Sequence, residues 1–181
     1  MKFIVLDIEA TCWKIPPPGF IQETIEIGAC ILNPFGELES TFSEFIKPVF
    51  HPQLSHFFFF FTSIRQEDVN RAKKFIEVIE NFYDWAELDD NESFSICTWG
   101  NFDRNLLTKD CERCDFNTNF LNHHLNIKQQ YQQIRKQKKS TGLKYAVEKE
   151  DIEWTGKHHR ALDDAKNLAK IVLKFMDNWQ Y

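Results

Sequence analysis

Four acids and one histidine stand in three short blocks that lie far apart in the chain. Asp7 and Glu9 lie in FIVLDIEAT, Asp103 lies in CTWGNFDRNLL, and His159 and Asp164 lie in HHRALDDAKNLA. Residues this distant form one site only if the fold brings the blocks together. Four clustered carboxylates would repel one another unless divalent cations lay between them. The pattern therefore constrains the fold, and it predicts a two-metal phosphodiester hydrolase.

Length and composition predict one globular domain over residues 1–181. The 181 residues, of which 43% are hydrophobic and 18 are Phe, suffice to bury a core. No run of about 18 uninterrupted apolar residues occurs, so neither a transmembrane helix nor a membrane partner is expected. The N-terminal apolar run reaches Asp7 too early for a signal peptide, and the expected location is therefore cytoplasmic.

The net charge of −5 bears on whether the chain can bind a polyanion. Overall acidity argues against wide, nonspecific wrapping of nucleic acid. It does not argue against a small site in which bound cations cancel the acids. Basic runs at 135–139 and 157–160 are local exceptions, and a solvated helix end explains the first run as well as a substrate-guiding patch does.

Hydrophobic periodicity predicts an α/β sandwich with a mixed sheet of about five strands flanked by helices. The Asn33-Pro34-Phe35-Gly36 stretch predicts a hairpin turn, and Asn101 is a candidate cap for a helix that ends near Cys114. The strands are expected at 3–8, 24–33, 38–47, 94–98 and 119–124, and further helices at 64–71, 72–87, 127–138, 142–149 and 160–178.

The spacing of Asp7 and Glu9 places both on one side of a strand. Positions i and i+2 of a strand face the same way, so both carboxylates point into one site while Ile8 is buried opposite. Carboxylate oxygens are hard ligands that suit Mg²⁺ or Mn²⁺ better than zinc.

Several motifs together resemble those of the DEDDh-type 3′→5′ exonucleases, in particular the Eri-type branch that includes sporulation-inhibitor-like bacterial exonucleases. The stretches that carry the resemblance occur in the same order in this chain: FIVLDIEATCW, EIGACILN, FIKPVFHPQLS, CTWGNFDRNLL, NIKQQYQQ, TGLKYAVE and GKHHRALDDAKNLA. Each motif alone is weak, but the combination is specific and covers nearly the whole chain.

This resemblance implies a ribonuclease H-like fold, a three-layer sandwich, with two Mg²⁺ or Mn²⁺ ions as cofactors. It implies the release of nucleoside 5′-monophosphates from the 3′ ends of single-stranded RNA or DNA. Asp7, Glu9, Asp103 and Asp164 match the four metal-binding acids of the family, and His159 matches its general base. A histidine with an ordinary pKa near ~6.5 accepts a proton at neutral pH.

The resemblance also implies substrate contacts around the acids. Thr11 and the backbone of Ala10 match positions that contact the terminal ribose, and Trp13 is expected to cover that nucleotide. Phe102, directly before Asp103, is a candidate stacking wall for the terminal base, although core packing explains this ring equally well.

The last block contains two residues, His158 and Asp163, that could be mistaken for the general base and the metal ligand. His159 and Asp164 are five positions apart, so His159 is expected in a loop or at the helix start and Asp164 on the first turns. His158 competes as the base, and the register of the family favours His159. Asp163 is expected to point about 100° away from Asp164 and to have a structural role.

The segment HPQLSHFFFFFTSIRQEDV departs from the family. The usual motif is close to LTGI, and here Ser63 replaces a glycine that tolerates positive φ. Phe57 or a neighbour is a candidate for stacking on a base. The simpler interpretation, which we favour, is that most of the five consecutive Phe at 57–61 fill the core.

Residues 110–124 hold other potential ligands. Cys111 and Cys114 form a CxxC, but the adjacent pair His123 and His124 suits no common zinc spacing, so two free thiols are favoured over a zinc site. Asp110 is expected to be an ordinary surface acid.

Three functional hypotheses remain open at this point. The leading one is an exonuclease on single-stranded RNA or DNA. The second is a binding module that has kept the fold and lost turnover, against which the intact set of five residues argues. The third is an exonuclease that a protein partner recruits to its target.

Overall fold

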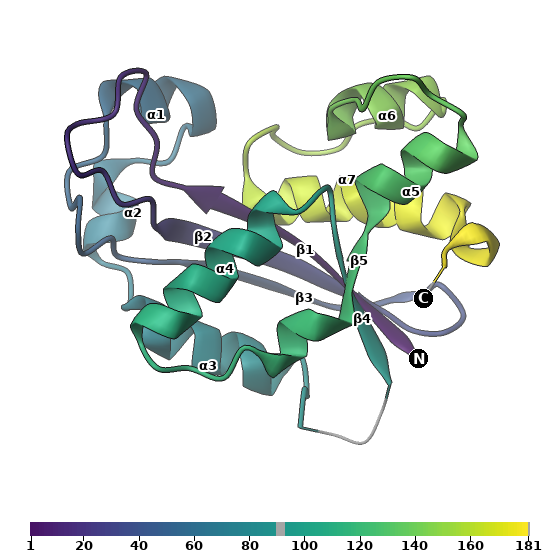
Figure 1. Ribbon diagram of the computed structural model, residues 1–181, viewed down its shortest axis with the longest axis horizontal. Coiled ribbons are helices and arrows are strands. Elements are labelled where there is room, and N and C mark those ends of the chain that lie inside the picture. The colour runs from purple at the N-terminus through teal and green to yellow at the C-terminus, as the bar shows by residue number, and fades with distance from the viewer. Residues whose placement is uncertain (90–92, 181) are drawn as a thin grey trace.

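A mixed five-stranded sheet with helices on both faces organises the chain (Figure 1). The computed structural model describes residues 1–89 and 93–180. The strands are β1 (Lys2–Ala10), β2 (Thr24–Leu32), β3 (Leu38–Phe45), β4 (Phe94–Thr98) and β5 (His124–Asn126). The helices are α1 (His56–Thr62), α2 (Gln66–Asn70), α3 (Phe75–Trp85), α4 (Phe102–Arg113), α5 (Ile127–Ile134), α6 (Leu143–Lys149) and α7 (Ala161–Lys174). No helix in these described ranges combines the length and apolar character that crossing a membrane requires.

The order of the strands in the sheet is β3-β2-β1-β4-β5. The first three strands are antiparallel neighbours, and β4 and β5 run parallel to β1. The turn between β2 and β3 closes as expected, because the Gly36 N–H donates to the Asn33 carbonyl at 2.9 Å. The mixed sheet and its meander are therefore confirmed.

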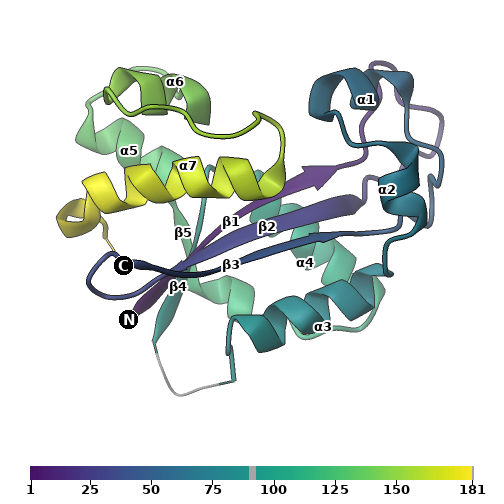
Figure 2. The same cartoon turned by 180° about the vertical axis from the view of Figure 1, so that it is seen from behind.

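Alternation along β1 separates the two layers of the core. Ile4, Leu6 and Ile8 pack towards α3 and α4, whereas Phe3 and Val5 pack towards α5, α6 and α7. Figure 2 shows α7 lying across β1 and β2, with α3 and α4 on the opposite side of the sheet. This is the predicted three-layer sandwich, and both chain ends lie away from the arrowhead of β1 (Figure 1).

Several element boundaries differ from the sequence prediction, three of them in the second half of the chain. Residues 119–123 form a short 3₁₀ helix instead of a strand, since the adjacent residues Phe120 and Leu121 are both buried and do not alternate. The helix at 127–138 ends at Ile134 because Lys136 adopts a left-handed φ of 49°. The last long helix ends at Lys174, and a 3₁₀ turn covers 176–178.

The run of five Phe forms α1, a helix that the sequence did not predict, and the expectation that most of them fill the core is wrong. The Ser55 hydroxyl caps the helix by accepting the Phe58 N–H at 3.0 Å. A short helix turns only every third or fourth side chain inward, so Phe58 and Thr62 are buried at 1% exposure each. The other four rings remain 42–79% exposed, with Phe60 the most exposed.

Ser63 ends α1 in the left-handed conformation with a φ of 62°. Its N–H donates to the Phe59 carbonyl at 2.9 Å and closes the last turn. A glycine adopts this conformation without the steric cost that a side chain brings. The position where the family pattern has glycine is therefore one where the backbone favours it, and Ser63 bears a local strain.

Because Gly28 has no side chain, the backbone of α7 packs directly against the backbone of β2 at this position. A Cβ atom at Gly28 would lie 2.0 Å from the backbone nitrogen of Leu162 and 2.2 Å from the carbonyl carbon of Ala161. Backbone atoms cannot rotate away as side-chain ends do, so any larger residue would push the start of α7 off the sheet. The same strand pairs Gly28 with Asp7 of β1.

We expect Gly28→Ala to lower the free energy of unfolding by about 2 kcal/mol or more, because overpacking here strains backbone and not a flexible side chain. Urea denaturation of the purified variant measures this change. Gly142→Ala is the matched control: no atom lies within 4 Å of a Cβ there, and its φ is −69°. The control should stay within about 1 kcal/mol of the wild type. Equal stability of both variants would contradict the close approach.

Candidate active site

The end of β1 presents two carboxylates on the α7 side of the sheet. Asp7 and Glu9 continue the alternation of Phe3 and Val5, while Ile8 packs on the opposite face. Pairing with β4 reaches only Val5, so the end of β1 extends beyond its parallel neighbour. Both acids thus lie where β1 and β4 diverge, as the spacing of two predicted.

Asp103 reaches this point from the first turn of α4. Its carboxylate is buried at 5% exposure, and Oδ1 accepts the Ile8 N–H at 3.2 Å. That hydrogen bond fixes the start of α4 against β1 beyond the last β4 pair. Asn101 precedes the helix without capping it, since its Oδ1 accepts the Asn126 side-chain N–H at 2.9 Å.

Asp164 comes from the first turn of α7, which lies across β1 and β2. Oxygens of Asp7, Glu9 and Asp164 all lie within 4.8 Å of one another. Oδ2 of Asp164 accepts the His159 N–H at 3.2 Å. Oδ1 is buried and has no hydrogen-bond partner in the described part of the chain. An unpartnered carboxylate oxygen among other acids is what a divalent cation would satisfy.

The pKa values of all four carboxyl groups are raised, and burial is the largest cause for each. The pKa rises to about 6 for Asp103, to about 7 for Asp164 and to about 8 for Glu9. That of Asp7 is raised well above its usual value, with the charges of Asp103 and Asp164 adding to the effect of burial. Bound cations would reverse this repulsion, so the donor set fits divalent metal ions.

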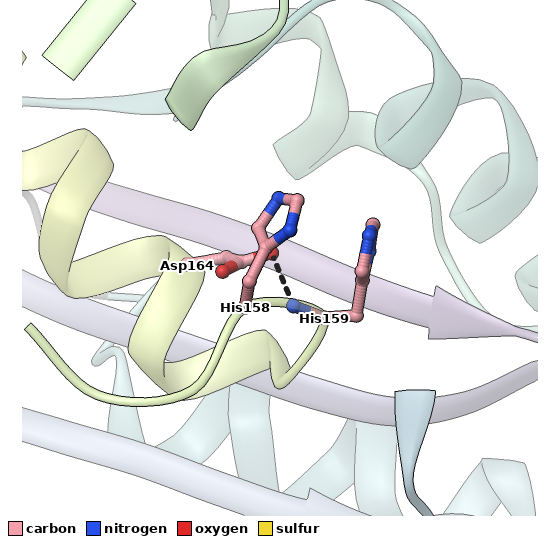
Figure 3. Close-up of side chains that lie close together, drawn as sticks. All are labelled: His158, His159 and Asp164. Carbon is pink, nitrogen blue, oxygen red and sulfur yellow. Dashed lines mark hydrogen bonds between the residues drawn. The ribbon is translucent and has the colours of Figure 1, made fainter. Parts of the chain in front are cut away.

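His159 lies in the loop directly before α7, as expected, with a left-handed φ of 62°. Its ring packs on Phe61, with centroids 3.9 Å apart, and on His158 at 3.8 Å. Figure 3 shows both imidazoles on the same side of the loop as the Asp164 carboxylate. Burial lowers the pKa of His159 to about 4, so the imidazole is neutral at pH 7 and its lone pair is free to accept a proton.

Glu26 is a buried acid that the sequence reasoning missed. It is 1% exposed and opposes Glu9 on β2. Its carboxylate pairs with Arg160, with Nη2 to Oε1 at 2.9 Å, and accepts the Ala161 N–H at 3.2 Å. The pair holds the start of α7 on β2. The sequence signal that could have revealed this role is the presence of a charged residue inside the mostly apolar run TIEIGACIL.

Asp163 has the structural role expected of it. Its Oδ2 accepts the Lys157 N–H at 2.8 Å, and its carboxyl group fills the space beside Gly156. This contact fixes the loop that carries His158 and His159. Asp163 is therefore outside the carboxylate cluster that contains its neighbour Asp164.

The residues predicted to bind substrate surround the end of β1 in different environments. Ala10 ends the strand, and Thr11 is fully buried with its hydroxyl accepting the Glu23 N–H at 3.0 Å. Trp13 packs edge-on against Phe20 and His51. Their substrate contacts stay predictions.

Two other predicted substrate residues are aromatic and partly exposed. Phe102 is 50% exposed, so the alternative that it packs in the core is wrong. Phe57 is 42% exposed and stacks on Phe61 at 5.9 Å. Because Phe61 in turn contacts His159, Phe57 and Phe61 form an aromatic pair beside this histidine.

The segment at 110–124 contains no joint site. Cys111 packs in the core, the Cys114 thiol is directed to the Cys111 carbonyl at 3.3 Å, and His124 bonds Thr98 at 2.7 Å. The described groups able to hold a metal include no cysteine. The expectation that Asp110 is a surface acid is wrong, since it is buried at 6% exposure and accepts the Thr24 N–H at 2.9 Å.

Comparison with known proteins places this geometry in a family. The RNase_T model, described as exonuclease, matches residues 4–172. The chain belongs to this exonuclease family. The chain is 33% identical over 181 residues to the human 3′-5′ exoribonuclease 1, covering 96% of this chain and 52% of that protein. It thus spans about half the length of that relative. It is 29% identical to the probable 3′-5′ exonuclease KapD of Bacillus subtilis (strain 168), over 99% of this chain and 87% of KapD.

A solved structure of the family supports the same assignment. The nuclease domain of 3′hExo, a DEDDh family member bound to rAMP, superimposes with a TM-score of 0.87 at 31% identity. The match covers 97% of this chain and 92% of that one. The predicted ribonuclease H-like fold is therefore confirmed. Exonucleases of this family depend on divalent metal ions.

The raised pKa values predict that the metal-free protein loses stability as the pH rises from about 6.5 to about 8.5. An acid with a higher pKa in the folded state binds more protons when folded, so the free energy of unfolding falls as the pH rises between the unfolded and folded pKa values. The folded values of about 7 for Asp164 and about 8 for Glu9 set this range. His159 has the opposite effect, but only below its unfolded pKa of about 6.5.

The thermal midpoint of EDTA-treated protein across this pH range measures the effect, and added Mg²⁺ should reduce the slope. Asp164→Asn should flatten it, because one buried charge is removed. Asp84→Asn, on an exposed residue of α3, is the control and should keep the wild-type slope. A thermal midpoint of the metal-free wild type that stays constant or rises over this pH range would refute the raised pKa values of these carboxyl groups.

Proposed function

We propose that this protein, as a single domain over residues 1–181, is a 3′→5′ exonuclease that releases nucleoside 5′-monophosphates from single-stranded RNA or DNA. The convergence of four carboxylates and a neutral histidine at the end of β1 carries the proposal. The names of the relatives support it, as does the rAMP bound to the 3′hExo domain, which is the type of product expected.

Asp7, Glu9, Asp103 and Asp164 would hold two divalent cations, which we propose to be Mg²⁺ or Mn²⁺. All the donor atoms are hard carboxylate oxygens, and at least one of them has no other partner. Two cations bound there supply Lewis acidity for the displacement at the scissile phosphate and lower the pKa of the attacking water.

His159 is the proposed general base that accepts the proton of the attacking water. Its imidazole is neutral at pH 7, and the rings of Phe61 and His158 pack against it and restrict it. The Asp164 carboxylate fixes the backbone beneath it by accepting the His159 N–H. The proposed base His159 and the metal ligand Asp164 thus lie on the same junction between a loop and α7. This arrangement holds the two side chains in a defined position relative to each other.

The terminal nucleotide is proposed to lie among Ala10, Thr11, Trp13, Phe57 and Phe102. The exposed faces of Phe57 and Phe102 suit stacking on bases, since such stacking tolerates any base. Phe61, not named from the sequence, joins this set because its ring links Phe57 to His159.

We also propose a cytoplasmic location and recruitment by a protein partner. All five cysteines are free thiols, in keeping with the reducing cytoplasm predicted from the sequence. The exposed rings of α1 offer a surface for a recruiting protein, which stays a prediction. A binding module without turnover is the competing function, and the complete donor set argues against it.

The deciding experiment incubates matched 5′-labelled single-stranded RNA and DNA with the protein and Mg²⁺, Mn²⁺ or EDTA. Product ladders that shorten from the 3′ end, and that EDTA abolishes, would establish the activity and its preference for RNA or DNA. Binding without shortening under every metal condition would favour the binding module.

We expect Asp164→Asn to reduce kcat to near the background rate, since it removes a ligand charge. His159→Ala should lower kcat by about 10²–10⁴-fold, the usual contribution of a general base. Calorimetric titration with Mn²⁺ should show weakened binding only in Asp164→Asn. Asp177→Asn, on an exposed residue after α7, is the control. Loss of Mn²⁺ binding in His159→Ala would show that its role is misassigned.

Phe102→Ala should raise KM for an oligonucleotide about 5- to 100-fold, because stacking contributes about 1–3 kcal/mol per base. The rate of the chemical step should change less. Phe60→Ala is the matched control, since Phe60 is 79% exposed and contacts His56 and Phe59 instead of His159. Equal KM values for the two variants would remove Phe102 from the substrate site.

A further inference from the structure

A second group of possible metal ligands lies beside the carboxylate cluster and differs from it in chemistry. Nitrogen atoms of His158 and His159 and an oxygen of Asp164 all lie within 4.8 Å of one another. Figure 3 shows the two rings rising from adjacent positions of the loop, with the Asp164 carboxylate beside the His158 ring. Two imidazoles and one carboxylate form a borderline-soft donor set, whereas the neighbouring cluster has oxygen donors only.

The surrounding residues hold these three side chains in place. The His158 ring stands edge-on to Trp154 at 5.2 Å, and the His159 ring packs on Phe61 at 3.9 Å. The left-handed backbone of His159 and its N–H bond to Asp164 fix the turn between them. The backbone of the loop is therefore held in place, and an ion would bind here by rotating the two adjacent imidazoles towards a common point.

Asp164 belongs to both groups of ligands and has one oxygen without a protein partner in the part of the chain that the structure describes. The residue is 6% exposed, and its buried Oδ1 has no hydrogen-bond partner among the described residues. A buried carboxylate oxygen without a partner costs free energy, which a cation would recover. Because Asp164 also belongs to the carboxylate cluster, an ion on the histidines would compete with that cluster for the same oxygens.

The donor types select the ion. Two histidines and one carboxylate are a common protein ligand set for Zn²⁺, with the fourth position left to water. Adjacent histidines are uncommon in zinc sites, so the case for this site rests on the proximity of its three ligand atoms in the fold, all within 4.8 Å of one another. Mg²⁺ prefers oxygen ligands and stays with the carboxylates. Imidazole also binds Co²⁺, which serves as a spectroscopic substitute for Zn²⁺.

We propose that His158, His159 and Asp164 form a second, overlapping site for Zn²⁺, and that its occupation inhibits the exonuclease. The ion takes the lone pair of the His159 imidazole, which then cannot accept a proton from water. It also draws Asp164 away from the carboxylate cluster. Binding of Zn²⁺ stands on the geometry alone, and only the inhibition rests on the proposed function.

The test titrates Zn²⁺ by calorimetry into EDTA-stripped, redialysed protein in saturating Mg²⁺, and records the visible absorption of the Co²⁺ form. His158→Phe keeps a ring of similar shape against Trp154 and removes only the nitrogen ligands. His158→Asn is the second variant, should the first fold poorly. His123→Asn is the control, because this exposed histidine packs on Phe94 away from the site.

We expect wild type and His123→Asn to bind Zn²⁺ equally and both His158 variants to bind it at least about tenfold more weakly. The Zn²⁺ concentration that halves Mg²⁺-dependent cleavage should rise by the same factor in the His158 variants. Unchanged Zn²⁺ binding in folded His158 variants would overturn the site, as would no binding by the wild type. Should the wild type bind Zn²⁺ but cleave no substrate with Mg²⁺, the proposed function fails while the site stands.

Discussion

The backbone approach of α7 to β2 determines where the chemistry of this protein lies. Gly28 leaves room for the start of the helix, and Glu26 holds it there through Arg160 and the Ala161 N–H. Since Gly28 and Glu26 pair with Asp7 and Glu9 on β1, the same contact that positions the helix positions Asp164 over those acids. A glycine and an ion pair thus set the dimensions of the site.

This arrangement concentrates negative charge, and the surroundings determine how that charge is used. Burial and mutual repulsion raise the pKa values of the four acids, which makes cation binding the favourable way to keep them ionised. Phe61 of α1 packs on the His159 ring and restricts it. Asp164 lies between oxygen donors and imidazole donors, so under the proposed Zn²⁺ site the ion bound there would determine whether His159 stays free.

The sequence predicted the sheet and the convergence of the acids because both follow from local patterns. The spacing of two between Asp7 and Glu9 predicted that both side chains lie on one face of a strand. The motifs and their order predicted that the three blocks come together in one site. The roles of Glu26 and Asp110 were not predictable in this way. Glu26 is buried against Arg160 and Asp110 against the Thr24 N–H and hydroxyl, and each of these partners lies in another part of the fold and is distant in sequence.

What the sequence determined by itself was the alternation, the turns, the donor types and the family to which the chain belongs, since these depend on residue identity and short-range spacing. Only the tertiary structure decided the environment of each side chain. It turned four of the five Phe at 57–61 outward, made Ser63 adopt a left-handed backbone, and placed His158 beside the Asp164 carboxylate. The reason is physical: burial and proximity arise from packing between elements, and no local pattern specifies how closely two elements pack.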